Sequence, residues 1–222
     1  MAKPAQKEEP QEELVNVRRR QGRAKKTREK ILAAALTEFA TLGFEGTTTR
    51  SIAERAKIPH GLVVYHFETK LNVWQAVIEN ALIDFHEEIE RTYRELKGSD
   101  SEILLRAYHR AFILVSARKP ELNWLFSHEV AGQSERLSWL LDQVQGSDIE
   151  QTLNLIRELQ AAGKYIEGDP AHLHFLFIGA ASRVFALAPE IEYRIGVSPF
   201  DESFVERHIE LCARLFFRDG PS

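Results

Sequence analysis

Apolar side chains recur with helical spacing through most of this sequence, and this periodicity restricts the fold more than any other feature. From Thr27 onward they fall every three or four positions, as in two adjacent rows, Ile31, Ala35, Phe39 and Leu32, Leu36, Ala40. Gly43 follows these rows, and glycine is favoured just beyond a helix C-terminus. Glycine and proline are few and gather between the periodic stretches. The pattern therefore predicts an all-α protein.

Two short helices joined by a tight turn are predicted between residues 48 and 67. Thr48 is a good N-cap for the first of them, and Lys57-Ile58-Pro59 breaks it. The second helix begins at His60 and ends near Phe67. Such a pair is a helix-turn-helix unit, and Val63 and Phe67 are expected to close a small core beneath its second helix.

The rest of the chain is predicted to be helical as well, with about nine or ten helices in total. A long helix should run from about Lys70 to Leu96 and stop at Lys97-Gly98-Ser99-Asp100, where Ser99 or Asp100 caps the next helix. The remaining helices are expected at about 101–118, 121–131, 134–145, 148–162, 170–187 and 202–217. The stretch from Pro189 to Pro199 is interpreted as a break between the last two.

Charge is unevenly distributed along the chain and suggests three parts. Residues 14–70 carry twelve Lys or Arg against five Glu, whereas residues 71–222 carry fifteen against twenty-four Asp or Glu. Residues 1–24 are polar and are expected to form a disordered basic arm. Residues 25–70 are expected to form the helix-turn-helix domain, and residues 71–222 a second, helical domain. Only the basic first third is expected to meet a polyanion.

Residues 27–77 resemble the DNA-binding domain of TetR-type regulators. The phrases that carry the resemblance are FATLGFEGTT, SIAERA and IPHGLVVYHFETK, in that order. It implies an all-α homodimer that represses a palindromic operator and is released by a small-molecule effector. Residues 71–222 are accordingly expected to be the effector-binding and dimerisation domain. DPAHLHFLFIGAASRVFALAPEIE and SFVERHIELCARLFFRDGPS, with a weaker match in RKPELNWLFSHEVAG, are loosely similar to the pyrimidine-utilisation regulators of the same family.

The second helix of the pair is about as wide as the DNA major groove, so its exposed residues are candidate contacts. His60 can donate to a base edge or a phosphate, Leu62 can press on a thymine methyl group, and Gly61 allows a close backbone approach. Tyr65 and His66 can reach phosphates, although Tyr65 could instead pack and His66 could cap the helix. The complete candidate set, to which the resemblance contributes, is Thr48, Thr49, Arg50, His60, Gly61, Leu62, Tyr65, His66 and Lys70.

Two positions depart from the usual pattern of the family. Val64 stands where an aromatic residue is common, which puts one phosphate contact in doubt. His60 stands where lysine or serine is more usual, so the operator sequence cannot be taken from relatives. Whether the basic arm enters a groove or is a plain solvated tail is open at this stage.

The last two predicted helices are apolar on more than one face. A helix that is apolar all round is buried on all sides, which in a chain of this size suggests a four-helix interface with a second copy. Aromatic residues with a few polar groups on the middle helices and the start of helix 170–187 are candidates for an effector pocket. They are Tyr108, Phe112, Trp124, Phe126, His128, Trp139, His174 and Phe175. The same residues could simply be the core of a bundle.

No cofactor, metal site or catalytic motif is expected. His172 and His174 are two residues apart, so they point in different directions on a helix. The sequence contains neither a phosphate-binding glycine loop nor a nucleophile motif, so we expect no enzyme. The longest apolar run, Phe175 to Ala188, is short and contains Arg183. With no signal-peptide pattern and a single cysteine, Cys212, a cytoplasmic protein with no membrane partner is expected. An effector-independent dimeric DNA-binding protein and an activator are the open alternatives.

Overall fold

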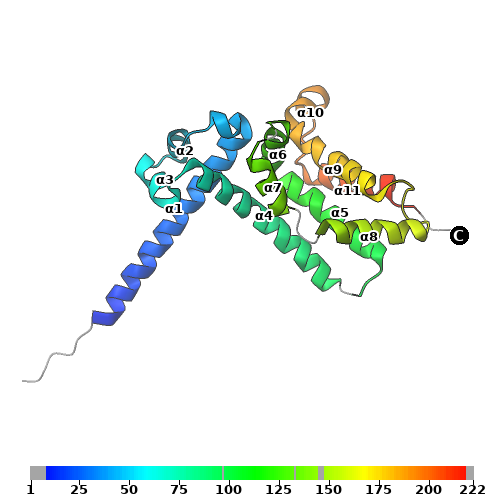
Figure 1. Ribbon diagram of the computed structural model, residues 1–222, viewed down its shortest axis with the longest axis horizontal. Helices are drawn as coiled ribbons and strands as arrows, with labels where there is room; N and C mark the ends of the chain where they lie inside the picture. The colour runs from blue at the N-terminus through cyan, green and yellow to red at the C-terminus, as the bar shows by residue number, and fades with distance from the viewer. Residues whose placement is uncertain (1–8, 97, 133, 145–147, 219–222) are drawn as a thin grey trace, which may run out of the picture. The chain divides into compact units, whose positions relative to one another are not determined.

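The computed structural model describes residues 9–96, 98–132, 134–144 and 148–218, and this part of the chain is built from eleven helices (Figure 1). The only β-type pairing among these residues is an isolated bridge between Tyr165 and Phe217. The all-α prediction is thus confirmed. The chain divides into two compact units, residues 1–77 and residues 78–222.

The first unit contains α1 (Glu9–Gly46), α2 (Thr49–Ala56), α3 (His60–Phe67) and the beginning of α4 (Lys70–Glu95). The expected disordered arm is wrong where the structure describes it, because residues 9–24 continue α1 upstream. Arg, Lys, Gln and Glu are good helix formers, so a polar stretch can extend a helix whose later turns are packed. Residues 1–8 lie outside the described residues.

The boundary between the units falls inside α4, seven residues later than the sequence suggested. Val73, Trp74 and Val77 are buried. The Trp74 ring meets the Phe44 ring edge-on, with centroids 6.2 Å apart. The first turns of α4 therefore complete the core of the helix-turn-helix unit.

The core of the first unit lies where α1 packs on α2 and α3. Ile31, Ile52 and Val63, one from each helix, are fully buried. Gly43 has φ 67° and interrupts the helical geometry of α1, so the expected helix end at this glycine is confirmed, although one more helical turn follows. Glycine reaches this positive φ without the steric cost that a Cβ would add.

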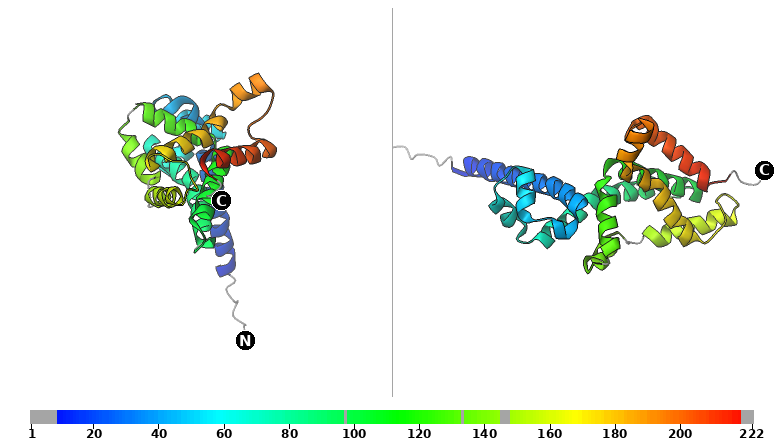
Figure 2. Two further views of the ribbon diagram at one scale, coloured as in Figure 1. Left: turned by 90° about the vertical axis from the view of Figure 1, so that its right-hand side faces the viewer. Right: turned by 90° about the horizontal axis from the view of Figure 1, so that it is seen from above.

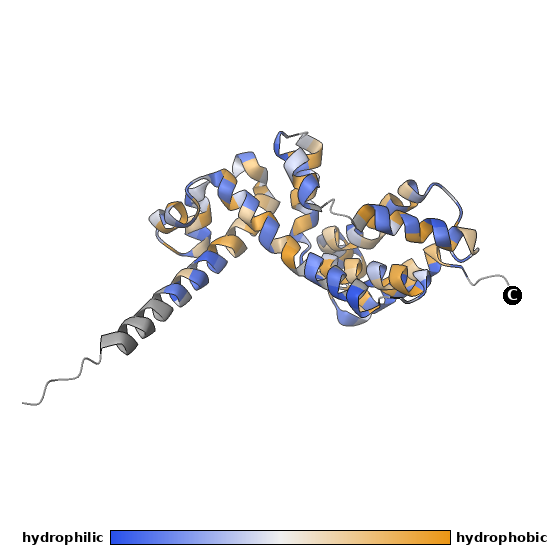
Figure 3. Cartoon of the chain, turned by 60° about the horizontal axis from the view of Figure 1, so that its bottom comes forward, coloured by the Kyte–Doolittle hydropathy of each residue, from blue (hydrophilic) through white to orange (hydrophobic). Residues whose placement is uncertain are grey.

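The second unit contains the rest of α4 and seven further helices, which carry apolar and polar residues on different faces (Figure 3). They are α5 (Ser101–Arg118), α6 (Glu121–Gly132), α7 (Arg136–Val144), α8 (Asp148–Ala161), α9 (Pro170–Ala186), α10 (Ala188–Ile195) and α11 (Glu202–Phe216). Asp100 caps α5 by accepting a hydrogen bond from the Glu102 amide, as the sequence predicted. Mutual packing of α5, α8, α9 and α11 encloses the core of this unit.

The helix α10 corrects the interpretation of residues 189–199 as a break. Pro189 lies in its first turn, where a proline costs no hydrogen bond because the first amides of a helix have no partner within it. In Figure 2, α10 stands clear of the other helices of its unit. Of the described helices, none alone has the length and apolarity to cross a bilayer, whereas α9 and α10 together pass that test as a pair bent by 64°.

Candidate nucleic-acid interface and the core of the second unit

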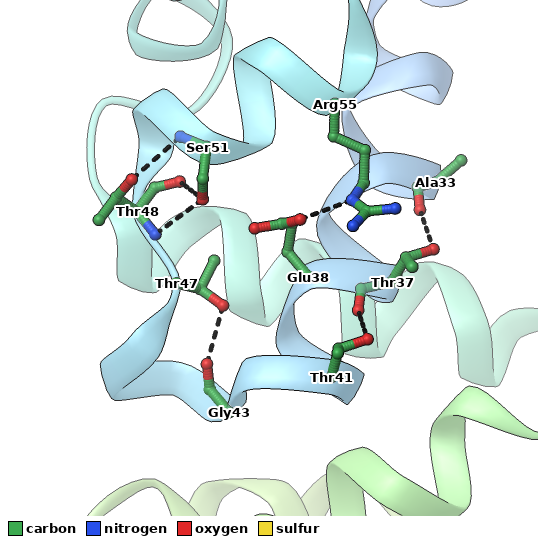
Figure 4. A network of polar contacts seen from close by, with 9 residues as sticks. All are labelled: Ala33, Thr37, Glu38, Thr41, Gly43, Thr47, Thr48, Ser51 and Arg55. Carbon is green, nitrogen blue, oxygen red and sulfur yellow. Dashed lines mark hydrogen bonds and ion pairs between the residues drawn. The ribbon is translucent and has the colours of Figure 1, made fainter.

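The start of α2 is fixed by a reciprocal pair of hydrogen bonds (Figure 4). The Thr48 hydroxyl accepts from the Ser51 amide at 3.0 Å, and the Ser51 hydroxyl accepts from the Thr48 amide at 3.2 Å. This capping box satisfies amides that the first turn of a helix leaves without partners. At the other end of α2, Lys57 takes a left-handed conformation with φ 54° and ends the helix. The cap and the stop together hold α2 to eight residues.

The helix α3 presents an outer face and buries an inner one. Val63 and Phe67 are buried, as expected, and the Arg28 guanidinium lies over the Phe67 ring at 5.2 Å. Tyr65 is 76% exposed, which argues against the alternative that it packs in the core. His60, Gly61 and Leu62 are also exposed, and His66 is half-buried. The residues predicted to contact DNA on α3 therefore lie on its outer face.

The three candidates at the start of α2 differ in what their side chains do. The Thr48 side chain caps the helix, and Arg50 is exposed. Thr49 is half-buried, and its hydroxyl oxygen lies 3.0 Å from Nε2 of His60. That contact joins the first residue of α2 to the first residue of α3.

Lys70, expected to bind a phosphate, has a partner inside the first unit. Its ammonium donates to the Phe44 carbonyl at 2.8 Å and lies over the Phe44 ring at 4.2 Å. Lys70 thus links α4 to the segment that follows the kink in α1. Since an ammonium has three donors, this link leaves capacity for a further acceptor, and the phosphate contact stays a prediction.

An ion pair between a buried carboxylate and an exposed guanidinium ties α1 to α2. The Arg55 guanidinium donates to the Glu38 carboxylate, which is 5% exposed (Figure 4). Burial alone would raise the pKa of Glu38, but hydrogen bonds from Arg55 and Ser51 and the charge of Arg55 outweigh it and lower that pKa. Glu38 lies beside Phe39 on the inner face of α1. The helical spacing of the apolar residues gives no sign of a buried carboxylate at this position.

An imidazole occupies the centre of the second unit. His109 on α5 stacks on the Phe177 ring of α9 with centroids 3.5 Å apart and an interplanar angle of 8°. Phe216 and Phe217 approach its edges at 6.0 and 5.4 Å, and Tyr165 lies at 6.3 Å. His109 falls in the apolar row Leu105, His109, Ile113, and this position is the sequence signal that could have found it.

Three polar side chains in this core have a buried atom with no hydrogen-bond partner among the described residues: Nδ1 of His109, Nδ1 of His174 and the hydroxyl of Tyr165. Burial, with smaller contributions from His174 and Arg106, holds the pKa of His109 well below its usual range. Burial also lowers the pKa of His174 and raises that of Tyr165. Each buried polar atom without a partner costs roughly 1–3 kcal/mol. The core therefore contains neutral hydrogen-bonding groups at an energetic cost.

The eight predicted effector-pocket residues do not lie together in one cluster. Tyr108, Phe112 and His174 come together, with ring centroids 6.5 Å apart for Tyr108 and Phe112 and 6.4 Å apart for Tyr108 and His174. Phe175 is 62% exposed and faces away from this core. The others lie on α6 and α7, where Trp124 donates to the Ala186 carbonyl, Phe126 and Trp139 are half-buried, and His128 is exposed.

Two helices of the second unit leave apolar rows exposed. On α9 the row contains Phe175, Leu176, Gly179 and Ala180, and on α11 it contains Leu211 and Leu215. A Cβ added at Gly179 would meet nothing within 4 Å. These are the two helices that the sequence singled out as apolar on more than one face, and within one chain only their inner faces are covered. Among the described residues, no group of three or more potential ligands could hold a metal ion.

Residues 31–77 match the protein family described as "Bacterial regulatory proteins, tetR family". The HTH-type transcriptional regulator RutR of Escherichia coli O157:H7 is 29% identical over 188 residues, which cover 83% of this chain and 86% of RutR. The crystal structure of HlyIIR, a hemolysin II transcriptional regulator, is similar with a TM-score of 0.56 and 26% identity, over 85% of this chain and 97% of that one.

A second solved structure shares the fold. AibR, crystallised with isovaleryl coenzyme A and operator DNA, is similar with a TM-score of 0.68 and 18% identity. The similarity covers 86% of this chain and 98% of AibR. The similarities to RutR, HlyIIR and AibR each span most of the present chain, so both units, and not only the helix-turn-helix, have counterparts in these proteins.

Proposed function

The chain belongs to the TetR family of bacterial regulatory proteins, and from that premise we propose that it is a dimeric repressor that leaves its operator when a small molecule binds its second unit. The observation that carries the proposal is the outer face of α3, where His60, Leu62 and Tyr65 are exposed above buried Val63 and Phe67. A helix held in this way can enter a major groove while the rest of the unit contacts phosphates.

Operator binding is tested by selecting sequences from a random duplex library with the full chain. Tyr65→Ala should then weaken binding to the selected duplex by about 1–2 kcal/mol, without changing the unfolding transition. Tyr193→Ala is the matched control, since Tyr193 is a tyrosine on the second unit and is 90% exposed. Equal affinity of both variants would remove Tyr65 from the interface, and a wild-type chain that enriches no sequence would contradict the function.

We further propose that two copies of the chain associate through α9 and α11. Support comes from the exposed apolar rows on both helices, and from Gly179 and Ala180, whose small side chains permit close approach of a second backbone. Two copies would supply two recognition helices, which a palindromic operator requires.

The interface is tested by placing a charge in the α9 row. Leu176→Glu should convert the dimer to a monomer in analytical ultracentrifugation at micromolar concentration, because a carboxylate would be buried against apolar surface. Ile103→Glu on α5, a change at a position of similar exposure, should leave the dimer intact. A Leu176→Glu variant that sediments as the wild type would place the interface elsewhere.

The effector is proposed to bind beside the partnerless polar atoms of His109, Tyr165 and His174. A ligand that hydrogen-bonds to these atoms would recover the energy that their burial costs, and would favour the state of the second unit in which it binds. AibR, which shares the fold, was crystallised with both isovaleryl coenzyme A and operator DNA. Since α4 belongs to both units, a shift of this helix is the route we propose between the two sites.

Effector release is tested by screening metabolites for thermal stabilisation of the wild-type chain and then adding each hit to the operator complex. A coupling of roughly 2–3 kcal/mol would reduce operator affinity by about thirty- to a hundredfold. Hits that bind tightly and leave operator affinity unchanged would favour the alternative of an effector-independent DNA-binding dimer.

A further inference from the structure

The contact between Thr49 and His60 joins the two helices of the helix-turn-helix at their first residues. The Thr49 hydroxyl oxygen and Nε2 of His60 are 3.0 Å apart, across eleven positions of sequence. We propose that Thr49 is a positioning residue, which fixes the His60 ring so that its Nδ1–H donates to a hydrogen-bond acceptor on a base edge in the major groove of the operator. This proposal rests on the proposed DNA-binding function and adds to it a specificity-determining pair.

The place of Thr49 at the beginning of α2 is what directs its hydroxyl across the turn. Inside a helix a threonine hydroxyl commonly bonds to the carbonyl four residues earlier, as Thr37 and Thr41 do in α1. Thr49 follows the N-cap, Thr48, whose backbone is extended, so no helical carbonyl lies one turn before it. The neighbouring hydroxyls of Thr48 and Ser51 are engaged in the capping box.

The hydrogen bond also sets which nitrogen of His60 carries the proton. A neutral imidazole has one donor nitrogen and one acceptor nitrogen, and the partner of one nitrogen decides the state of the other. A hydroxyl can donate or accept, but no carbonyl of α2 is available to the Thr49 hydroxyl. We therefore assign this hydroxyl as the donor to Nε2, which leaves the proton on Nδ1. His60 is exposed at the start of α3, so this donor is open to solvent and to DNA. In the major groove, the acceptors suited to such a donor are N7 of either purine, O6 of guanine and O4 of thymine, whereas cytosine presents a donor.

Fixing the ring before DNA arrives increases the selectivity of the contact. A free histidine side chain can rotate and exchange its tautomer, and can thereby satisfy a donor or an acceptor on a base edge. A ring held by Thr49 offers a donor in one direction only, and its ordering is already complete in the free protein. Thr49 thus acts on sequence discrimination through His60, whereas a direct phosphate contact would affect all sequences alike.

The test uses the full chain and a duplex obtained by selection from a random library with the wild type. The base pair that His60→Ala no longer discriminates identifies the position read by His60. We expect the wild type to prefer the selected base pair there by roughly five- to tenfold, the value of one net hydrogen bond. Thr49→Val should lose most of this preference, and Thr49→Ser should keep it because the hydroxyl remains.

A double-mutant cycle separates positioning from direct contact. If Thr49 acts through His60, adding Thr49→Val to His60→Ala causes no further loss of discrimination at that base pair. Discrimination by Thr49→Val equal to that of the wild type, or independent losses in the double variant, would overturn the proposal while leaving the DNA-binding function in place. If the wild type enriches no sequence, both the positioning role of Thr49 and the proposed DNA-binding function are contradicted.

The tautomer can be measured without DNA. In ¹⁵N spectra of the free chain, the wild type should show His60 with its proton on Nδ1, and Thr49→Val should shift it toward a mixture of both tautomers. Thr49→Ser should resemble the wild type. A wild-type His60 with its proton on Nε2 would overturn the assignment of Nδ1 as the reading donor.

Discussion

The polar groups that join the helices of the first unit and those in the aromatic core of the second unit differ in whether they have partners. In the helix-turn-helix unit, each polar group considered has a hydrogen-bond partner: Arg55 for Glu38, the Phe44 carbonyl for Lys70, and His60 for Thr49. In the second unit, His109, Tyr165 and His174 each have a buried polar atom without a partner among the residues described. Satisfied polar groups hold neighbouring helices in one arrangement, whereas unsatisfied ones leave hydrogen-bonding capacity that another molecule can use.

This difference suggests that the two units have different tasks. The first unit has to present α3 in one orientation, so linking α1, α2, α3 and α4 by specific polar contacts serves its task. In the proposed function the second unit responds to a ligand. Buried polar atoms without partners make its core less stable than a fully paired core would be, so a ligand that pairs with them can stabilise it. Stability measurements on variants of each unit test this contrast.

The largest effect is expected from truncating the ring beneath His109. Phe177→Ala should lower the free energy of unfolding by about 3–5 kcal/mol, because the Phe177 side chain is fully buried and leaves a cavity. Phe175→Ala, two residues away on the same helix and 62% exposed, should change it by less than about 1 kcal/mol when both changes are measured in the Leu176→Glu background, where the proposed dimer interface does not contribute. Urea denaturation checks both values, and similar losses in the two variants would contradict the assignment of inner and outer faces on α9.

The next largest effect is the loss of folding stability at low pH that is due to His109. Burial lowers the pKa of His109 in the folded chain. Below about pH 6.5, His109 is therefore protonated in the unfolded chain while it stays neutral in the folded chain. Stability is therefore lost as the pH falls from about 7 to about 5. Each such group contributes at most about 1.4 kcal/mol per pH unit. The groups that act on His109 electrostatically are His174 and Arg106, and Tyr165 lies beside it.

His109→Phe isolates this contribution. The variant should lose roughly 1–2 kcal/mol less than the wild type between about pH 7 and pH 5, with the remaining slope coming from groups such as His174 and His208, whose pKa values burial also lowers. His172→Phe, at an exposed histidine on α9, should keep the slope of the wild type. Identical pH profiles for His109→Phe and the wild type would show that His109 is not buried as described.

Features that depend on residues close together in the sequence could be predicted from it. The starts of α2 and α5 were predictable because Thr48 and Asp100 cap helices through atoms two or three residues away. The outer and inner faces of α3 follow from helical spacing, so Tyr65 and Val63 were placed correctly. The extension of α1 upstream was not predicted, because polar composition says that a segment has no core but does not say that it cannot be helical.

Other features depend on contacts between distant residues and were missed for that reason. The Thr49–His60 contact requires the turn between α2 and α3 to bring two helix starts together, and helical spacing carries no such information. His109 was passed over in favour of more conspicuous aromatic residues such as Phe175, which the fold turns outward. Pro189 was interpreted as a helix breaker, although the first turn of α10 accepts it.

A smaller effect is expected at the kink in α1. Gly43 has φ 67° and ψ 178°, a region that residues with a Cβ hardly enter, so Gly43→Ala should destabilise the first unit by at least about 1 kcal/mol. Gly22→Ala is the matched control, because Gly22 lies within α1 and a Cβ there would meet nothing within 4 Å. That change should stabilise the helix slightly. Amide hydrogen exchange in α1 to α3 measures both, and equal protection in the two variants would contradict a required positive φ.

The smallest effect at physiological salt is expected from the basic segment at the beginning of α1. If Arg18, Arg19 and Arg20 meet phosphates, deleting residues 1–20 should reduce the slope of log affinity against log salt by roughly 0.9 for each phosphate that the chain no longer neutralises. Deleting only residues 1–13, whose net charge is −2, should leave that slope unchanged. Because α1 continues through this segment at about 1.5 Å per residue, it can carry its positive charges along a phosphate backbone, whereas a plain solvated tail would give the same slope in both deletions.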